Sequence, residues 1–519
     1  MLRGPMKNSQ KKRTIPVITK PSLDASDLAF KNNADLENSI VDHVTLYLLT
    51  QDELANILVE QPVIEESLEE IQGGIFRLIE ASRLTTDIVE NDVVLRISGS
   101  INRQKSRIES VKWLNQNLVL GKLFDKAKQN YVNIIKKAEK NNANHFNQAL
   151  ESQNKSTHII TNEAEYISFT TNDYLGLSNH PHVIKSATEA LQNYGNSTCC
   201  ARVAGGTTPL HKTLESEIAA FLESESAVLF NAGYLASLAI SEILDKDDAV
   251  ICDRLNHASI FDGIKMSHAK LYRFKHNCTK SLEIQLKRIP KEKNKVVFIE
   301  GIYSMEGDIA PLPEIISLVE RYNAYLFVDE AHSIGCLGET GKGIFEHFGI
   351  DPNKATLRMG TFSKSFGSIG GFVVGRKLIC DMLRYSSRQY IFTASLAPSI
   401  VSGATKAVSI LNSSPELTKK LQKTSKSFIQ KVIKAGFDVG NTTTQIIPII
   451  IGDEEKACRV HKYLLEKGIY TTSVIYPVVP KGAARIRIGI TTDHTEEELE
   501  KLLGTLLQMK YVLNNFMRI

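Results

Sequence analysis

The sequence predicts an α/β protein built on a mostly parallel β-sheet that helices cover on both faces. Between about residues 165 and 400, short β-rich runs alternate with amphipathic helical stretches, and polar residues follow several of the runs. Alternation of this kind is typical of βαβ units. The strands are expected at 227–230, 249–252, 296–300, 325–329 and 372–374, and helices at 208–222, 279–288 and 312–322.

The residues after the expected strands predict where a site lies. In open α/β sheets, ligands bind outside the carboxyl ends of the strands. Polar or small residues follow the strands at Asn231-Ala232-Gly233, Asp253, Gly301 to Ser304, and Asp329 to His332. We therefore expect the functional residues to gather at this edge of the sheet.

The pattern divides the chain into five parts. Residues 1–35 read as a disordered basic tail, and residues 36–110 as an appended small domain of unknown role. Residues 111–164 are expected to be an N-terminal helical segment, because apolar residues recur every three or four positions between 120 and 138. Residues 165–405 are the large domain. Residues 406–519 are a smaller α+β domain, with strands expected at 446–451 and 484–490.

Composition excludes several classes of function. The 519-residue chain is 42% hydrophobic and 23% charged with a net charge of +4, which gives no basis for expecting nucleic-acid binding. The longest aliphatic runs are strand-length, so no membrane span is expected. Seven cysteines, with Cys199 and Cys200 adjacent and no CxxC pair there, predict neither a disulfide framework nor a metal site. A reducing, cytoplasmic setting follows.

A lysine in a loop of small residues is the first chemical signal. Lys364 lies within Gly360-Thr361-Phe362-Ser363-Lys364-Ser365-Phe366-Gly367-Ser368-Ile369-Gly370-Gly371. Small neighbours allow a flat ring to approach, and hydroxyl and backbone N–H groups can hold a phosphate. Taken alone, the loop is equally well a surface loop with a solvated lysine.

The second signal is Asp329-Glu330-Ala331-His332, directly after an apolar strand. An acid at a strand end can pair with a protonated pyridine nitrogen. The same four letters occur in ATP-dependent helicases, which also need an upstream phosphate loop of the form GxxxxGK[ST]. The Gly341-Lys342 pair lies downstream of the box and is followed by Gly343, so the helicase interpretation fails.

Two further signals complete the set. His257, after the strand 249–252, can stack on a planar cofactor, although a lone histidine is more often a structural hydrogen-bonding group. Arg485 and Arg487 alternate on one face of an expected strand and can bind a carboxylate through a bidentate fork. The alternative for these arginines is an exposed strand face.

The order of these motifs resembles the α-oxoamine synthase family of fold-type I pyridoxal-phosphate (PLP) enzymes. These are aspartate-aminotransferase-like transferases, and they include 2-amino-3-ketobutyrate CoA ligase, aminooxononanoate synthase, aminolevulinate synthase and serine palmitoyltransferase. The resemblance runs from about residue 123 to 519. It is carried by the motifs above together with 171–177, 206–211, 303–308, 390–395 and 480–487.

The resemblance implies the residues that surround the cofactor ring. Lys364 would carry PLP as a Schiff base, and Asp329 would pair with the pyridinium nitrogen. His257 would stack on the ring, so these three are the expected catalytic residues. His332 and Ser304 would hydrogen-bond the ring hydroxyl. No metal is implied.

The resemblance also implies a phosphate site and a substrate site. Gly233, Tyr234 and Thr361 would bind the phosphate, and Thr393 would reach it from the partner subunit of a homodimer with shared active sites. Asn172 and Arg487 would bind the substrate carboxylate, whereas Arg485 does not match the family's carboxylate-binding arginine.

The implied reaction joins a small amino acid (glycine, alanine or serine) to the acyl group of acyl-CoA or an acyl carrier protein. Loss of CO₂ is expected in most branches of the family, but the glycine C-acetyltransferase type of ligase retains the carboxylate. Ala201 leaves room for a substrate with a β-carbon, whereas 477–487 resembles the glycine-using ligase, and the Lys364 loop resembles bacterial serine palmitoyltransferases. The amino acid therefore stays open.

Two other functions stay open at this point. An aminotransferase or lyase can use the same fold and cofactor, and a binding subunit can keep the fold without the chemistry. The presence of Lys364 argues against the binding subunit.

Overall fold

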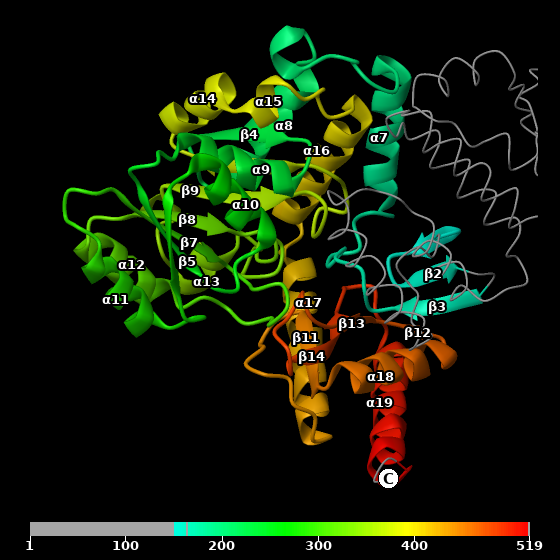
Figure 1. Ribbon diagram of the computed structural model, residues 1–519. Coiled ribbons are helices and arrows are strands. Elements are labelled where there is room, and N and C mark those ends of the chain that lie inside the picture. The colour runs from blue at the N-terminus through cyan, green and yellow to red at the C-terminus, as the bar shows by residue number, and fades with distance from the viewer. Residues whose placement is uncertain (1–149, 162–163, 517–519) are drawn as a thin grey trace, which may run out of the picture. The chain divides into compact units, whose positions relative to one another are not determined.

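The computed structural model describes residues 150–161 and 164–516 (Figure 1). The basic tail expected at 1–35, the appended domain at 36–110 and most of the helical segment at 111–164 lie outside the described residues. Among the described residues, no helix combines the length and apolarity needed to cross a membrane.

The centre of the large domain is a seven-stranded sheet in the order β4-β10-β9-β8-β7-β5-β6. Strand β10 runs antiparallel to both of its neighbours, and the other adjacent pairs are parallel. The predicted mostly parallel sheet is therefore confirmed. The strands are β4 (Ser226–Phe230), β5 (Ala249–Asp253), β6 (Lys270–Phe274), β7 (Lys295–Glu300), β8 (Tyr325–Asp329), β9 (Leu357–Thr361) and β10 (Gly371–Gly375).

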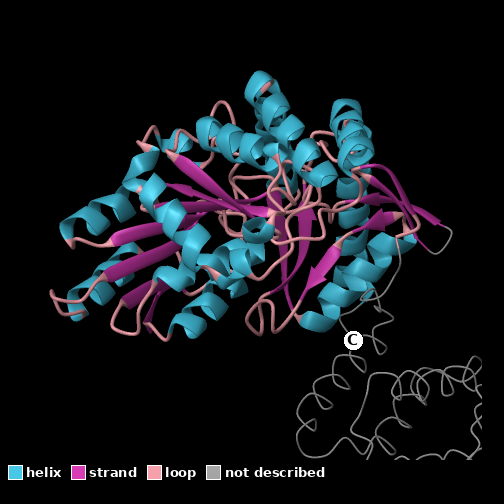
Figure 2. Ribbon diagram, turned by 90° about the horizontal axis from the view of Figure 1, so that it is seen from above, coloured by secondary structure: helices cyan, strands magenta, loops and turns pink. Residues whose placement is uncertain are grey.

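Helices cover both faces of this sheet, as the view from above shows (Figure 2). Alternation along β4 separates the faces: Ala227 and Leu229 join one buried cluster, and Val228 and Phe230 join the other. The first cluster includes residues of α8 (Pro209–Phe221), α11 (Thr279–Arg288), α12 (Leu312–Arg321) and α16 (Pro398–Ser413). The second includes residues of α9 (Gly233–Ile240), α10 (Ala258–Ser267), α14 (Lys377–Ser386) and α15 (Arg388–Ile391).

Shorter elements connect this layer structure. Helix α7 (Pro181–Tyr194) packs against α16, and α13 (Ile344–Phe348) follows the turns after β8. Three 3₁₀ turns lie at η1 (Arg202–Ala204), η2 (Ser241–Ile243) and η3 (Pro352–Lys354).

The C-terminal part is the smaller α+β domain, with a sheet of its own. A three-stranded antiparallel sheet has the order β11-β14-β13, made of β11 (Ile446–Gly452), β14 (Ala484–Gly489) and β13 (Thr472–Val474). Helices α17 (Pro415–Lys434), α18 (Glu454–Glu466) and α19 (Glu496–Phe516) accompany it. Both strands expected there, at 446–451 and 484–490, are present.

One prediction needs correction. The described end of the segment 111–164, for which we expected helix, forms strands β1 (Ser152–Lys155) and β2 (His158–Thr161), and β3 (Ala164–Ser168) follows. They join β12 (Ile469–Tyr470) of the C-terminal part in a four-stranded sheet. The physical reason is strand pairing: β1 pairs with β2 and β2 pairs with β3, whereas the apolar spacing that indicated a helix lies upstream, at 120–138.

Candidate active site

Two acids occupy neighbouring positions at the carboxyl edge of the large sheet. Glu300 ends β7 and Asp329 ends β8, and the two are paired in register. Both side chains are buried. Oδ1 of Asp329 accepts a hydrogen bond from the backbone N–H of Ala331 at 2.9 Å, which fixes the carboxylate at the edge where ligands bind in such sheets.

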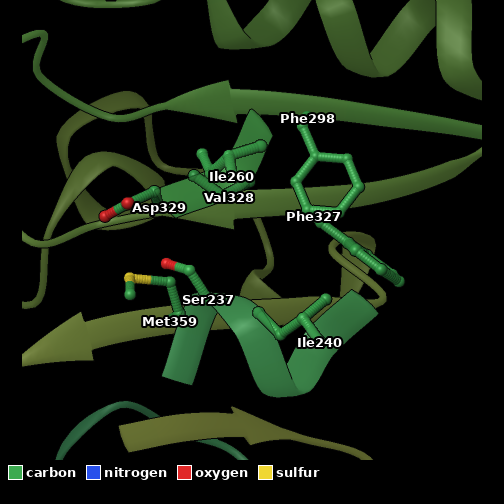
Figure 3. A pocket seen from close by; sticks show the side chains of 8 residues that line it. All are labelled: Ser237, Ile240, Ile260, Phe298, Phe327, Val328, Asp329 and Met359. Atoms are coloured by element: carbon green, nitrogen blue, oxygen red, sulfur yellow. The ribbon is translucent and has the colours of Figure 1, made fainter. Parts of the chain in front are cut away.

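The surroundings of Asp329 are largely apolar. Figure 3 shows Asp329 at one end of a small cavity between the sheet and helices α9 and α10, lined by Ser237, Ile240, Ile260, Phe298, Phe327, Val328 and Met359. Burial raises the pKa of the Asp329 carboxyl, while the Lys364 ammonium acts in the opposite direction. A cationic partner at this carboxylate is therefore strongly favoured.

Lys364 lies in a tightly held loop after β9. The Phe362 and Phe366 side chains on either side of it are fully buried, and the Gly367 N–H donates to the Lys364 carbonyl at 2.8 Å. Burial lowers the pKa of Lys364 to about 8, although Asp329 and Glu300 act to raise it. This is not a solvated surface lysine. A half-buried amine with a lowered pKa is suited to add to an aldehyde.

The start of α9 forms an anion cradle with the end of β9. Ala232 caps α9 without a side-chain hydrogen bond, which leaves backbone N–H groups free for an anion. A Cβ added to Gly233 would lie 3.0 Å from Cβ of Thr361 and 3.1 Å from its Oγ1. The Thr361 hydroxyl is also within 2.7 Å of the Ser363 hydroxyl. These groups fit a phosphate, and with Asp329 and Lys364 they fit PLP.

His257 presents an aromatic ring beside this cradle. The residue is the N-cap of α10, and its backbone N–H donates to Oε1 of Glu300. Its Nδ1 pairs with the Ser259 hydroxyl at 2.8 Å. The Tyr234 ring meets the His257 ring edge-on, with centroids 6.2 Å apart. Burial lowers the pKa of His257, with Asp329 opposing, so the ring is a neutral stacking surface near pH 7.

A cluster around Tyr174 links the ring site to an arginine. The Tyr174 hydroxyl donates to Oδ1 of Asn172 at 2.9 Å and lies 2.8 Å from Nδ1 of His332. One hydroxyl donates a single hydrogen bond, so His332 donates from Nδ1 and its Nε2 is an acceptor. Such an acceptor suits the ring hydroxyl of PLP. Burial lowers the pKa of His332 well below its usual value, which keeps it neutral.

The guanidinium of Arg487 completes the cluster. Its Nε donates to the Ser304 carbonyl at 2.8 Å, and its Nη2 donates to Asn172 Oδ1 at 3.1 Å and to the Tyr174 hydroxyl at 3.3 Å. All these partners are neutral. By contrast, Arg485 forms an ion pair with Glu306 at 3.1 Å. Both arginines are buried, so the exposed-face alternative is wrong.

Two further residues expected to bind the cofactor, Ser304 and Thr393, lie in the segments after β7 and α15. Ser304 follows β7 and is tied to the cluster by its carbonyl. Thr393 is half-buried after α15, next to the exposed Phe392. The neighbouring Ala394 carbonyl accepts a hydrogen bond from Asn231 Nδ2 at 2.6 Å, which ties this segment to the loop before α9.

Comparison with known proteins decides the family. Residues 164–506 match the model of the aminotransferase class I and II family. The 8-amino-7-oxononanoate synthase of Bacillus pumilus is 39% identical over 366 residues, which is 70% of this chain and 93% of that protein. The chain belongs to the α-oxoamine synthase family. It is a PLP-dependent acyltransferase with the fold-type I architecture.

Solved structures agree with this assignment. A serine palmitoyltransferase of Sphingomonas wittichii superposes with a TM-score of 0.73 at 32% identity, covering 76% of this chain and 99% of that one. The 8-amino-7-oxononanoate synthase of Francisella tularensis gives a TM-score of 0.58 at 28% identity, covering 67% and 98%. Serine palmitoyltransferase has also been solved with PLP. The predicted family, fold class and cofactor are confirmed.

Two residues of this α-oxoamine synthase site were not predicted from the sequence. Tyr174 stands two positions after Asn172 in a recognised motif, yet no role was assigned to it. Glu300 precedes the polar residues noted after β7, and its burial was not anticipated. The roles predicted for the individual site residues remain predictions.

Proposed function

We propose that this α-oxoamine synthase joins glycine, alanine or serine to the acyl group of a thioester, releasing the thiol and CO₂ and leaving an α-amino ketone. The observation that carries the proposal is the buried Arg487, whose described partners are all neutral oxygens. A buried cation without an anion is costly. An α-carboxylate supplies that anion, and a guanidinium binds it through a bidentate fork.

We propose that the cofactor is held at three places: its aldehyde, its phosphate and its ring. When bound, PLP supplies an aldehyde for Lys364 and a ring that accepts the electron pair of a Cα carbanion. Gly233, Tyr234 and Thr361 hold the phosphate, joined by Thr393 from the partner subunit of a homodimer. Asp329, His257, His332 and Ser304 hold the ring.

In this proposal Lys364 also moves the proton. Its Nζ, with a pKa lowered by burial to about 8, takes the proton from Cα of the amino acid at neutral pH. Asp329 keeps a proton on the ring nitrogen, and Arg487 with Asn172 fixes the carboxylate. The side chains of Phe362 and Phe366, fully buried on either side of the lysine, hold the loop in place.

The domain division, the homodimer, the cellular location and the thiol carrier also form part of the proposal. We assign 165–405 as the cofactor-binding large domain and 406–519 as the small domain. A homodimer is supported by the exposed large apolar side chains of Leu378, Met382 and Phe392, which lie on α14 and directly after α15. A cytoplasmic location is supported by the thiols of Cys199, Cys200, Cys252, Cys278, Cys336 and Cys380, none of which forms a disulfide. The thiol carrier is CoA or an acyl carrier protein.

Spectral titration of the PLP-loaded protein with single amino acids, followed by a thiol-release and CO₂ panel over acyl chain lengths, tests the function. We expect thiol and CO₂ in equal amounts without any 2-oxo acid. Formation of a 2-oxo acid would indicate an aminotransferase, and thiol without CO₂ would indicate the ligase type. Lys364→Ala should abolish the visible band and thiol release, whereas Lys342→Ala, at a part-exposed ion pair with Glu223, should preserve both.

A further inference from the structure

A part-buried histidine bridges two carboxylates, one at the end of β5 and one in the loop after β7. Nδ1 of His276 lies 3.1 Å from Oδ1 of Asp253, and Nε2 lies 2.9 Å from Oδ2 of Asp308. Only an imidazolium donates from both ring nitrogens. Burial acts to lower the pKa of His276, but the hydrogen bonds to the two carboxylates outweigh it and raise the pKa to about 10.

The bridge joins three separate segments of the large domain. Asp253 ends β5, His276 follows β6, and Asp308 lies in the loop after β7. Asn277 reinforces it, because its N–H donates to Asp253 Oδ2 at 2.8 Å and its Nδ2 donates to Asp308 Oδ2 at 2.9 Å. The fully buried Tyr303 ring packs edge-on against His276, with centroids 4.5 Å apart.

The same loop carries the anchor of Arg487. The loop closes on itself, since the Tyr303 N–H donates to the Asp308 carbonyl at 3.1 Å and the Gly307 N–H donates to the Tyr303 carbonyl at 2.8 Å. Within it, the Ser304 carbonyl accepts from Arg487 Nε at 2.8 Å. A shift of Asp308 therefore moves the oxygen that orients the guanidinium.

We propose that His276 is a positioning residue for substrate binding: its bridge between Asp253 and Asp308 fixes the Tyr303–Asp308 loop, so that the Ser304 carbonyl orients Arg487. The proposal rests on the proposed function, in which Arg487 binds the amino-acid carboxylate. Without the imidazolium, two buried carboxylates face each other with no cation between them. The loop then relaxes, and the guanidinium loses its fixed direction.

His276→Gln in the PLP-loaded enzyme tests this directly, because glutamine keeps much of the volume and loses the charge. We expect the Kd for the amino acid, read by spectral titration, to rise on the order of tenfold, the effect of about one hydrogen bond. The Kd for PLP should change by less than about threefold. The matched control is His182→Gln, on the exposed surface of α7, which should leave both constants unchanged.

A double-mutant cycle with Arg487→Lys separates positioning from general destabilisation. If His276 acts through Arg487, His276→Gln adds less than about twofold in the Arg487→Lys background. Losses that multiply, or a weakened cofactor with an unchanged amino-acid Kd, would overturn the proposal. If Arg487→Lys itself leaves the amino-acid Kd unchanged, the proposed function fails instead. If His276→Gln does not fold, Asp308→Asn, which removes one carboxylate charge at constant volume, provides the same cycle.

Discussion

The Tyr174 hydroxyl lies 2.8 Å from Nδ1 of His332 and 3.3 Å from Nη2 of Arg487. One buried phenol thus connects the group expected at the cofactor ring with the group expected at the substrate carboxylate. Burial raises the pKa of Tyr174 to about 12, although Arg487 acts to lower it, so the phenol stays neutral and keeps its proton for Asn172.

Tyr174→Phe should weaken both stability and amino-acid binding. The change removes the only described partner of His332 Nδ1 and one partner of Arg487. Leaving buried polar groups unpaired costs about 1–3 kcal/mol. Urea unfolding should show that loss, and spectral titration should show an amino-acid Kd raised about tenfold. Tyr385→Phe, at a side chain 85% exposed, is the control. Equal behaviour of the two variants would refute the role of Tyr174.

Arg487→Lys should separate the two buried arginines. Lysine cannot reproduce the bidentate fork, so we expect the amino-acid Kd to rise about 10- to 100-fold. Arg485→Lys should change it by less than about threefold, because Arg485 is already paired with Glu306. The measurement is a titration of both variants with the same amino acid. A larger effect of Arg485→Lys would mean that Arg485, and not Arg487, binds the substrate carboxylate.

Cofactor uptake should report the lowered pKa of Lys364. Only the free amine adds to an aldehyde, and burial places that pKa at about 8. The rate of PLP incorporation into cofactor-free protein should therefore rise with pH and level off above about pH 8. An ordinary lysine, with a pKa of about 10.4, would show a rate still rising at pH 9. Stopped-flow absorbance distinguishes the two profiles, and a profile of the second kind would contradict the burial argument.

The site residues that could be predicted from the sequence are those that lie in short, recognisable motifs. Asp329 and Lys364 each lie in a short motif whose residue types already suggest their chemistry. Tyr174 and His332 are 158 positions apart, and the role of the phenol depends on what it faces in the fold. Strand β9 was missed because it contains Gly360, a weak strand former, which is required there since a Cβ would lie 2.3 Å from the Phe372 ring.

The bridge of His276 to Asp253 and Asp308 should stabilise the fold more at low pH than at high pH. The pKa of His276 is raised from 6.5 to about 10 on folding. Its contribution to the free energy of unfolding is therefore fully present below about pH 6.5 and is lost as the pH rises from there towards 10. Wild type should be more stable than His276→Gln by about 1 kcal/mol or more at pH 6, and the gap should shrink between pH 8 and 10. Urea unfolding measures it. A gap that widened with pH would mean that the histidine is buried neutral.

Two buried serines should respond differently to loss of their hydroxyls. Ser237 lines the cavity that Asp329 shares (Figure 3), and its Oγ has no hydrogen-bond partner among the described residues. Ser333 is equally buried, but its Oγ donates to Oε2 of Glu330 at 3.0 Å. Removing a satisfied hydroxyl that bonds a charged group costs about 1.5–3 kcal/mol, whereas removing an unpaired one relieves a desolvation penalty.

Ser237→Ala should therefore leave the free energy of unfolding unchanged or raise it by about 1 kcal/mol, while Ser333→Ala should lower it by about 1.5 kcal/mol or more. Each variant differs from wild type by one oxygen atom, so packing changes little and the comparison isolates the hydrogen bond. Equal losses in urea unfolding would show that a bound water satisfies Ser237. The cavity would then be polar rather than apolar, and the raised pKa of Asp329 would need another cause than burial among hydrocarbon side chains.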